Sequence, residues 1–270
     1  MSAVAESRSP ETPILLRRDE GPVARVTLNR PQAYNALSVA LMEAALRELQ
    51  QIDRDPAVAC VVIEGAGRGF CAGHDLRELQ GDPSTEFREK TFSLCSRMMQ
   101  AVVGLRQPVI AKVHGIATAA GCQLVASCDL ALAAADARFG TPGVNIGLFC
   151  STPMVALSRA VPRKQAMEML LTGDMIDAET ATAYGLINRA VDGGPEALEE
   201  AVVALASKIA DKSSKVLKTG KDAFYRQIEM GLADAYGYTS GVMVENMGYR
   251  DAAEGVSAFL EKRKPVWTGE

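Results

Sequence analysis

Apolar and polar residues alternate along the chain with two different periods. Residues 23–29 alternate at every second position, as in a strand with one buried face, whereas 58–63 and 108–113 are continuously apolar, as in strands covered on both faces. Apolar residues recur every three or four positions over 39–54 and 83–105, which predicts helices. These repeated strand–helix units predict an α/β fold with right-handed crossovers.

The other predicted elements continue this order until the composition changes near residue 195. They are strands over 14–17, 129–133 and 186–191, and helices over 120–127 and 163–172. After that point only helices are predicted: 195–210, 213–227, 231–248 and 252–263. We therefore divide the chain into a polar, disordered tail (1–13), an α/β core (14–194) and a helical C-terminal segment (195–270).

Two of the predicted strands run into a turn of small residues that precedes a helix. Residues 65–76 follow one strand, and residues 114–121 follow another. Small residues let a second molecule approach the backbone, and they leave the first N–H groups of the helix unpaired. The alternative explanation for the small residues is that they allow the helix to pack tightly on the strand. Together, the two turns can aim two N–H groups at one carbonyl oxygen, and such a pair stabilises negative charge that develops there.

Three motifs in these turns resemble a known family. Phe-Cys-Ala-Gly-His-Asp-Leu (70–76), His-Gly-Ile-Ala-Thr-Ala-Ala-Gly-Cys-Gln-Leu (114–124) and Ser-Cys-Asp-Leu (127–130) resemble signatures of the crotonase, or enoyl-CoA hydratase/isomerase, superfamily. The resemblance covers the chain from about Leu15 to Trp267. It implies a crotonase-like core, a spiral of repeated β-β-α units, and a C-terminal all-helical segment that supports homotrimers or dimers of trimers. The run Thr-Pro-Gly-Val-Asn-Ile-Gly-Leu-Phe-Cys-Ser-Thr-Pro (141–153) also resembles the subgroup called enoyl-CoA hydratase domain-containing protein 3, a name that establishes no reaction.

The resemblance also implies a binding site for an acyl-CoA thioester. The backbone N–H groups of His74 and Ala120 would form the oxyanion hole, and the imidazole of His74 either reaches the substrate or has no role in it. The residues that would contact CoA are Arg30, Ala33, Ala72, Asp75, Leu76, Phe259 and Lys262. CoA would enter as part of the substrate, with no permanently bound cofactor. We expect His114 to be structural, and Asp75 and Asp129 to bond the backbone.

Two departures from the hydratase pattern change the expected chemistry. Hydratases of this superfamily activate water with two glutamates, and the corresponding residues here are Gln123 and Gly143. Neither can exchange a proton near neutral pH. Nearby polar residues are either loop and capping residues or a replacement acid, base or nucleophile: Asn145, Cys150 and Ser151. We therefore expect an acyl-CoA binding protein with little or no hydratase activity. The alternatives are a non-catalytic binding or assembly protein, and a thioesterase or isomerase that uses a different acid or base.

Composition limits the partners and the compartment. The net charge of −4 and the dispersed basic residues argue against nucleic acid or a charged membrane surface as a partner. The six cysteines lie mostly in apolar runs and lack the spacing of metal ligands, so we expect reduced core residues, no metal site and a cytosolic protein. No apolar run reaches the length of about 18 residues that a transmembrane helix needs.

Overall fold

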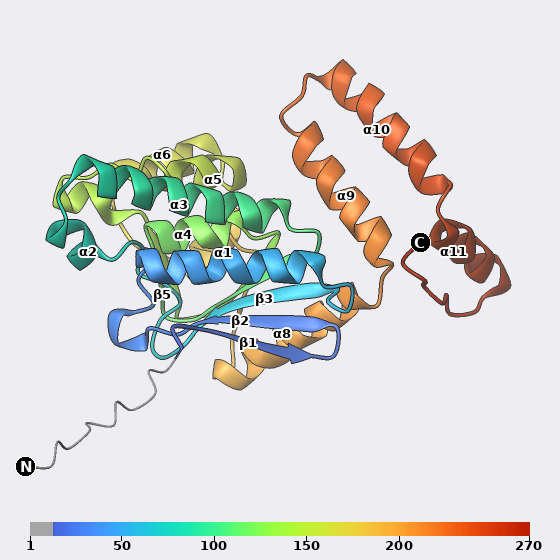
Figure 1. The fold of residues 1–270 in the computed structure, drawn as a ribbon, viewed down its shortest axis with the longest axis horizontal. Helices are drawn as coiled ribbons and strands as arrows, with labels where there is room; N and C mark the ends of the chain where they lie inside the picture. Colours follow the sequence, from blue (N-terminus) through green and yellow to red (C-terminus); the bar gives the residue numbers. More distant parts are fainter. Residues whose placement is uncertain (1–12) are drawn as a thin grey trace, which may run out of the picture.

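The main sheet organises the structure, a computed structural model that describes residues 13–270 (Figure 1). Its strand order is β1-β2-β3-β4-β6-β9. The first pair is an antiparallel hairpin and the remaining neighbours are parallel. The strands are β1 (Leu15–Glu20), β2 (Val23–Leu28), β3 (Cys60–Gly65), β4 (Val109–Val113), β6 (Leu130–Ala134) and β9 (Arg189–Val191). The predicted α/β class and parallel core are confirmed, and most of the predicted tail lies outside the described residues.

Helices cover both faces of this sheet. On one face lie α1 (Val39–Arg54), α3 (Thr85–Gly104) and α4 (Ala120–Ser127), and on the other lies α8 (Gly194–Ala210) (Figure 1). The period of two in β2 decides which side chains face which layer: Ala24, Val26 and Leu28 join the α1 side, and Val23 joins the α8 side. Residue 195, where the C-terminal segment was predicted to begin, therefore lies in a helix that packs on the sheet.

Several short elements were not predicted from the sequence. A second sheet has the order β5-β7-β8, formed by β5 (Ile116–Thr118), β7 (Arg138–Gly140) and β8 (Ile176–Asp177). The helix α5 (Pro153–Ala160) and the 3-10 helices η1 (Pro31–Ala33) and η2 (Pro142–Ile146) were also missed, whereas α2 (Leu76–Gly81) begins where the turn over 65–76 was expected to precede a helix. Strands of two or three residues and helices of three to eight residues are shorter than the window of about 11 to 18 residues in which a period is read. The helices α6 (Arg163–Thr172) and α7 (Ala178–Ala183) complete the core.

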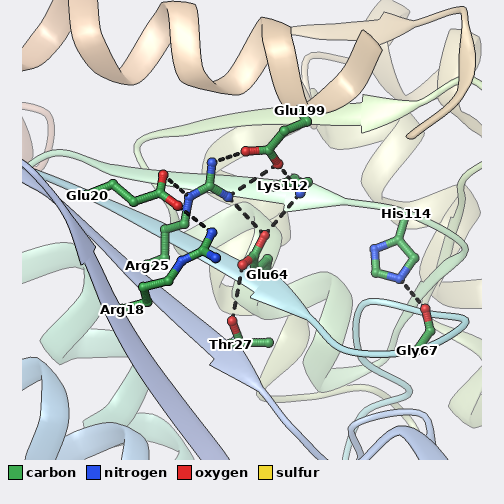
Figure 2. Close-up of polar contacts among 9 residues, drawn as sticks. All are labelled: Arg18, Glu20, Arg25, Thr27, Glu64, Gly67, Lys112, His114 and Glu199. Carbon is green, nitrogen blue, oxygen red and sulfur yellow. Dashed lines mark hydrogen bonds and ion pairs between the residues drawn. The ribbon is translucent and has the colours of Figure 1, made fainter. Parts of the chain in front are cut away.

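A network of ion pairs fastens α8 to the sheet (Figure 2). Arg25 on β2 is only 2% exposed, and its Nη1 lies 3.2 Å from Oε2 of Glu64 on β3. Lys112 on β4 approaches the same oxygen at 3.1 Å. Glu199 of α8 pairs with both cations. Each of these charges therefore has an opposite partner between the sheet and the helix.

The last three helices extend away from the sheet (Figure 1). They are α9 (Ser214–Gln227), α10 (Leu232–Met247) and α11 (Arg250–Glu261). Asp129 anchors the first of them, because it accepts hydrogen bonds from Lys221 Nζ at 2.7 Å, Tyr225 OH at 2.9 Å and the Val109 N–H at 2.6 Å. Asp129 thus bonds the backbone, as expected. In the described part of the chain no helix is both long and apolar enough to cross a membrane.

Candidate functional site

The two glycine-rich turns lie directly against each other. Gly73 has a φ of +94°, and a Cβ built on it would lie 2.9 Å from Ala119 Cβ and 3.2 Å from the backbone nitrogen of Ala120. Backbone hydrogen bonds align the segments, with Thr118 N–H donating to the Cys71 carbonyl at 3.0 Å. Because a side chain at residue 73 would push the turns apart, glycine is what allows this contact.

The start of α4 is held in a strained conformation. Ala119 has φ +49° and ψ −117°, a region that residues with a side chain rarely adopt. Its N–H donates to the Gly140 carbonyl at 2.9 Å, and this bond to the second sheet fixes the turn. The glycine after Ala120 packs still more closely, since a Cβ on Gly121 would lie 2.0 Å from the Cys71 carbonyl oxygen.

Two backbone donors at this junction have no protein acceptor. Among the hydrogen bonds of residues 13–270, none uses the backbone N–H of His74 or of Ala120. The backbone on either side of His74 is fixed, because Leu37 N–H donates to the Gly73 carbonyl at 2.7 Å and Asp75 N–H donates to the Leu37 carbonyl at 3.3 Å. The Ala120 N–H also lies in the first turn of α4, where the helix dipole favours negative charge. The arrangement can stabilise charge on a carbonyl oxygen.

The His74 side chain is buried and uncharged at neutral pH. Neither ring nitrogen has a hydrogen-bond partner within residues 13–270. The ring packs edge-to-face on Phe92 of α3, with 5.1 Å between the centroids and 85° between the planes. Burial lowers the pKa of His74 to about 4, and the backbone of Leu37 offsets only part of this effect. The imidazole therefore keeps one donor and one acceptor nitrogen at pH 7.

This pKa predicts a pH-dependent stability. An unfolded histidine titrates near pH 6.5, so on acidification the unfolded chain takes up this proton first and the folded state loses stability between about pH 6.5 and 4. Denaturant titrations at pH 7 and pH 4.5 should show that the wild type loses about 2 kcal/mol more than His74→Phe, which lacks the titrating group. Equal losses in the two proteins would contradict the burial of His74.

The positions of the two hydratase glutamates have different surroundings. Gln123 is 5% exposed, and its carboxamide has one weak polar contact within the described residues, from Cys95 Sγ to Oε1 at 4.0 Å. A Cβ on Gly143 would lie 2.4 Å from the Leu148 carbonyl oxygen and 2.8 Å from Cys150 Sγ. The loop backbone thus closes over the place where a side chain at residue 143 would begin.

The neighbouring polar residues make loop contacts. Asn145 Nδ2 donates to the Gly173 carbonyl at 3.4 Å, and Ser151 Oγ donates to the Phe149 carbonyl at 3.3 Å. Burial raises the pKa of the Cys150 thiol, which is therefore protonated at neutral pH. These contacts favour a structural role for all three side chains over an activated nucleophile.

Arg30 and Asp75, two of the predicted CoA contacts, form an ion pair beside the turns. Arg30 Nη2 lies 2.8 Å from Asp75 Oδ2, and Asp75 Oδ1 caps α2 by accepting the Arg77 N–H at 3.1 Å. Burial opposes ionisation of Asp75, but the hydrogen bonds from Arg30 and the Arg77 N–H outweigh it and lower the pKa of this carboxyl.

The neighbouring candidates complete one cluster. Ala72 N–H donates to the carbonyl of Tyr34, the residue after Ala33, and Leu76 is the exposed first residue of α2. Together with Arg30 and Asp75, these residues gather next to Gly73.

Phe259 and Lys262 are not brought to this cluster within one chain. They lie on α11 and just after it, at the far side of the molecule from α2 (Figure 1). Phe259 is 82% exposed. Lys262 follows the last helical residue and has a φ of +57°, so it lies outside the helix, although the helix predicted over 252–263 included both residues.

His114 has the structural contact that its sequence context suggested. Its Nε2 lies 2.9 Å from the Gly67 carbonyl oxygen (Figure 2). Gly67 belongs to the turn that leads into the Gly73 segment. His114 therefore links the end of β4 to this turn.

Comparison with known proteins decides the family. A family model described as Enoyl-CoA hydratase/isomerase matches residues 18–270. The chain belongs to the enoyl-CoA hydratase/isomerase family. The predicted superfamily is thereby confirmed, and the following comparisons concern its members.

Three similar family members support the subgroup and the fold. Enoyl-CoA hydratase domain-containing protein 3, mitochondrial, of Xenopus laevis is 45% identical over 98% of this chain and 89% of the frog protein. A crystal structure of an enoyl-CoA hydratase from Mycobacterium smegmatis is 52% identical, with a TM-score of 0.92 over 95% of this chain and 99% of that one. The human enoyl-CoA hydratase domain-containing protein 3 is 42% identical, with a TM-score of 0.91 over 94% and 100% of the two chains. The predicted subgroup and crotonase-like fold are confirmed.

The predicted cytosolic location is wrong. The frog relative and its human and rat counterparts are named as mitochondrial proteins. The prediction rested on the cysteines, which are all buried and unpaired in the structure. Reduced cysteines argue against an oxidising compartment, but they do not distinguish one reducing compartment from another.

A cleft of about 1110 Å³ is lined by residues of α4, Gln123 among them. Apolar side chains from three other helices line it, among them Met99 of α3, Val155 of α5 and Phe224 of α9. Tyr225, whose hydroxyl donates a hydrogen bond to Asp129, also lines the cleft. This cleft was not predicted, because its walls come from helices that are distant along the chain.

Proposed function

We propose that this family member binds acyl-CoA thioesters and polarises the thioester carbonyl between the backbone N–H groups of His74 and Ala120. The observation that carries the proposal is the contact of Gly73 with the start of α4, which leaves both donors without a protein acceptor. Two such donors suit an oxygen on which negative charge develops, as on the carbonyl of a thioester. CoA is bound as part of the ligand, and no permanent cofactor is needed for this role.

The surroundings of the donors suit the two ends of such a ligand. The cleft that Gln123 helps to line offers apolar walls for an acyl chain. The Arg30–Asp75 pair and the exposed start of α2 lie beside Gly73, where the CoA part would leave the site. The proposed ligand therefore lies across the junction of the two turns.

Calorimetric titration with butyryl-CoA and with free CoA tests this proposal. Butyryl-CoA should bind about tenfold more tightly, because free CoA lacks the thioester carbonyl that would lie between the two donors. In Gly73→Val the branched side chain would meet Ala119 and Ala120, so this preference should disappear. Equal affinity of the wild-type protein for both ligands would refute the proposed carbonyl site.

Hydration of crotonyl-CoA should be very weak or absent. The wild type should turn over far below the value of about 10 per second that is typical of enzymes, because Gln123 and Gly143 cannot activate water. Gln123→Glu/Gly143→Glu should not restore the reaction, since a side chain at residue 143 would collide with the Leu148 carbonyl. The loss of enoyl absorbance measures the rate. A wild-type turnover of about 10 per second or more would overturn this expectation.

We infer that the C-terminal helices associate with other copies of the chain in a trimer or a dimer of trimers. Large apolar side chains on them are exposed in the single chain: Phe224, Ile228, Leu232, Tyr236, Met243, Val244, Met247 and Phe259. Patches of this kind are rarely left open by monomers. Assembly in closed symmetry would cover them and bring Phe259 and Lys262 toward a neighbour's CoA.

Light scattering at micromolar concentration should therefore give the mass of three or six chains, and Leu232→Glu/Val244→Glu should lower it because two charges would enter the contact. A monomeric wild type would contradict the inference.

A further inference from the structure

The last residues of the chain, 265–270, turn back along α11 and form what we call the C-terminal strap. In Figure 1 the end of the chain lies between α11 and the start of α9. Trp267 Nε1 donates to the carbonyl of Asp211 at 2.8 Å, at the corner between α8 and α9. The Trp267 ring lies against α11, since a Cβ built on Gly255 would come within 3.2 Å of it. The strap therefore joins α11 to the end of α8.

One buried carboxylate, that of Asp251 at the start of α11, binds the strap. The side chain is in a residue only 1% exposed, and its Oδ1 accepts the Thr268 N–H at 2.7 Å and the Thr268 hydroxyl at 3.0 Å. Its Oδ2 accepts the Gly269 N–H at 3.0 Å. Burial opposes ionisation, but the hydrogen bonds from Ser213 and from the strap outweigh it and lower the pKa of Asp251. The strap donors thus converge on an ionised carboxylate.

The helix α11 has little else to hold it in one direction. Within α11 only Asp251 and Ala258 are buried, so the helix gains little from apolar packing. Tyr249, the residue before the helix, has its hydroxyl 3.0 Å from Thr219 Oγ1 of α9. Contacts at one residue let a helix pivot about that point. The strap adds an attachment at Asp211, and this attachment fixes the direction of α11.

The direction of α11 decides where the exposed Phe259 side chain and Lys262 are presented. We propose that Asp251 is a positioning residue, which binds the strap and so fixes α11 where Phe259 and Lys262 can contact CoA bound to a neighbouring copy. This inference rests on the proposed function, because α11 can act on CoA only if the assembled protein binds it. A fixed helix contacts the ligand without a further cost of ordering, whereas a pivoting helix must first be ordered.

Calorimetric titration of Asp251→Asn with free CoA and with butyryl-CoA tests the proposal. The new amide group would face N–H or hydroxyl donors of the strap and release it. Both ligands should bind about tenfold more weakly than to the wild type, with the preference for butyryl-CoA retained because the donors of the core are unchanged. Asp234→Asn is the matched control and should bind both ligands like the wild type, since Asp234 lies in the first turn of α10 but is exposed.

Fluorescence reports on the strap directly, because Trp267 is the only tryptophan of the chain. In Asp251→Asn its emission should move to longer wavelength and acrylamide should quench it more strongly, while the far-UV circular dichroism stays that of the wild type. Deletion of residues 265–270 should weaken CoA binding as much as Asp251→Asn does. The two changes combined should weaken it no further, because both act through the strap.

Four results would overturn the inference while leaving the proposed function intact in a wild type that binds CoA. They are wild-type affinity in Asp251→Asn, unchanged Trp267 emission in that variant, losses that add in the combined variant, and wild-type affinity in the deletion variant. The last of these decides the matter if Asp251→Asn does not fold. Failure of the wild type to bind either ligand would overturn both the inference and the proposed function.

Discussion

Gly121→Ala should lower the free energy of unfolding by about 3 kcal/mol, at the upper end of what overpacking costs. The added methyl group would lie 2.0 Å from the Cys71 carbonyl oxygen. This oxygen accepts the Thr118 N–H and so cannot move without breaking the bond that aligns the two turns. The variant should also lose the preference for butyryl-CoA over free CoA, because α4 would shift away from the turn at Gly73.

Gly220→Ala is the matched control for this substitution. Gly220 lies inside α9, and a Cβ there would meet nothing within 4 Å. Alanine is the better helix former, so this variant should be as stable as the wild type or more stable by up to about 1 kcal/mol. Urea denaturation of both variants compares the two glycines. A Gly121→Ala protein within about 1 kcal/mol of the wild type would contradict the close packing of α4 on residue 71.

Arg25→Met should cost about 3 kcal/mol of stability, the lower end of the range for breaking a buried ion pair. Methionine keeps much of the apolar stem, so the loss comes mainly from charge. Glu64 and Glu199 would be left with Lys112 as their only shared cation between the sheet and α8. The lower end of this range of destabilisation applies because the Glu199 side chain is still 35% exposed and water partly screens its charge.

Arg18→Met provides the matched control for Arg25→Met. Arg18 is the cross-strand neighbour of Arg25 and also pairs with Glu20, but its side chain is 70% exposed. Exposed pairs contribute less than about 1 kcal/mol, so this variant should unfold close to the wild type in the same titration. Equal losses for the two arginines would mean that the network does not hold α8.

The sequence predicted the main elements because they are long enough to show a period. The helix over 120–127 has the predicted ends, and the predicted strands of the main sheet lie within two residues of the observed ones apart from β1 and β9. The alternation in β2 also placed Arg25 on the face opposite Ala24 correctly. It could not show that this face is buried, because the covering residue, Glu199, comes from a helix 174 positions later.

The site was predicted only in part, for related reasons. The turns around Gly73 and Ala120 contain family motifs, so the resemblance to that family predicted that the two turns form one site. The structure places them in contact. The closed loop at Gly143 depends on where the Leu148 carbonyl points, which no motif encodes. The helix predicted over 252–263 included both Phe259 and Lys262, but the observed helix ends between them.

The proposed function requires the N–H groups of His74 and Ala120 to polarise a bound thioester carbonyl. Butyryl-CoA labelled with ¹³C at the carbonyl tests it most directly, because the carbonyl resonance responds to hydrogen bonding at the oxygen itself. On binding to the wild type the resonance should move downfield, and with Gly73→Val at a saturating ligand concentration it should return to its position in water. A wild-type complex in which the carbonyl resonance stays at its position in water would show that the two N–H groups do not polarise the thioester.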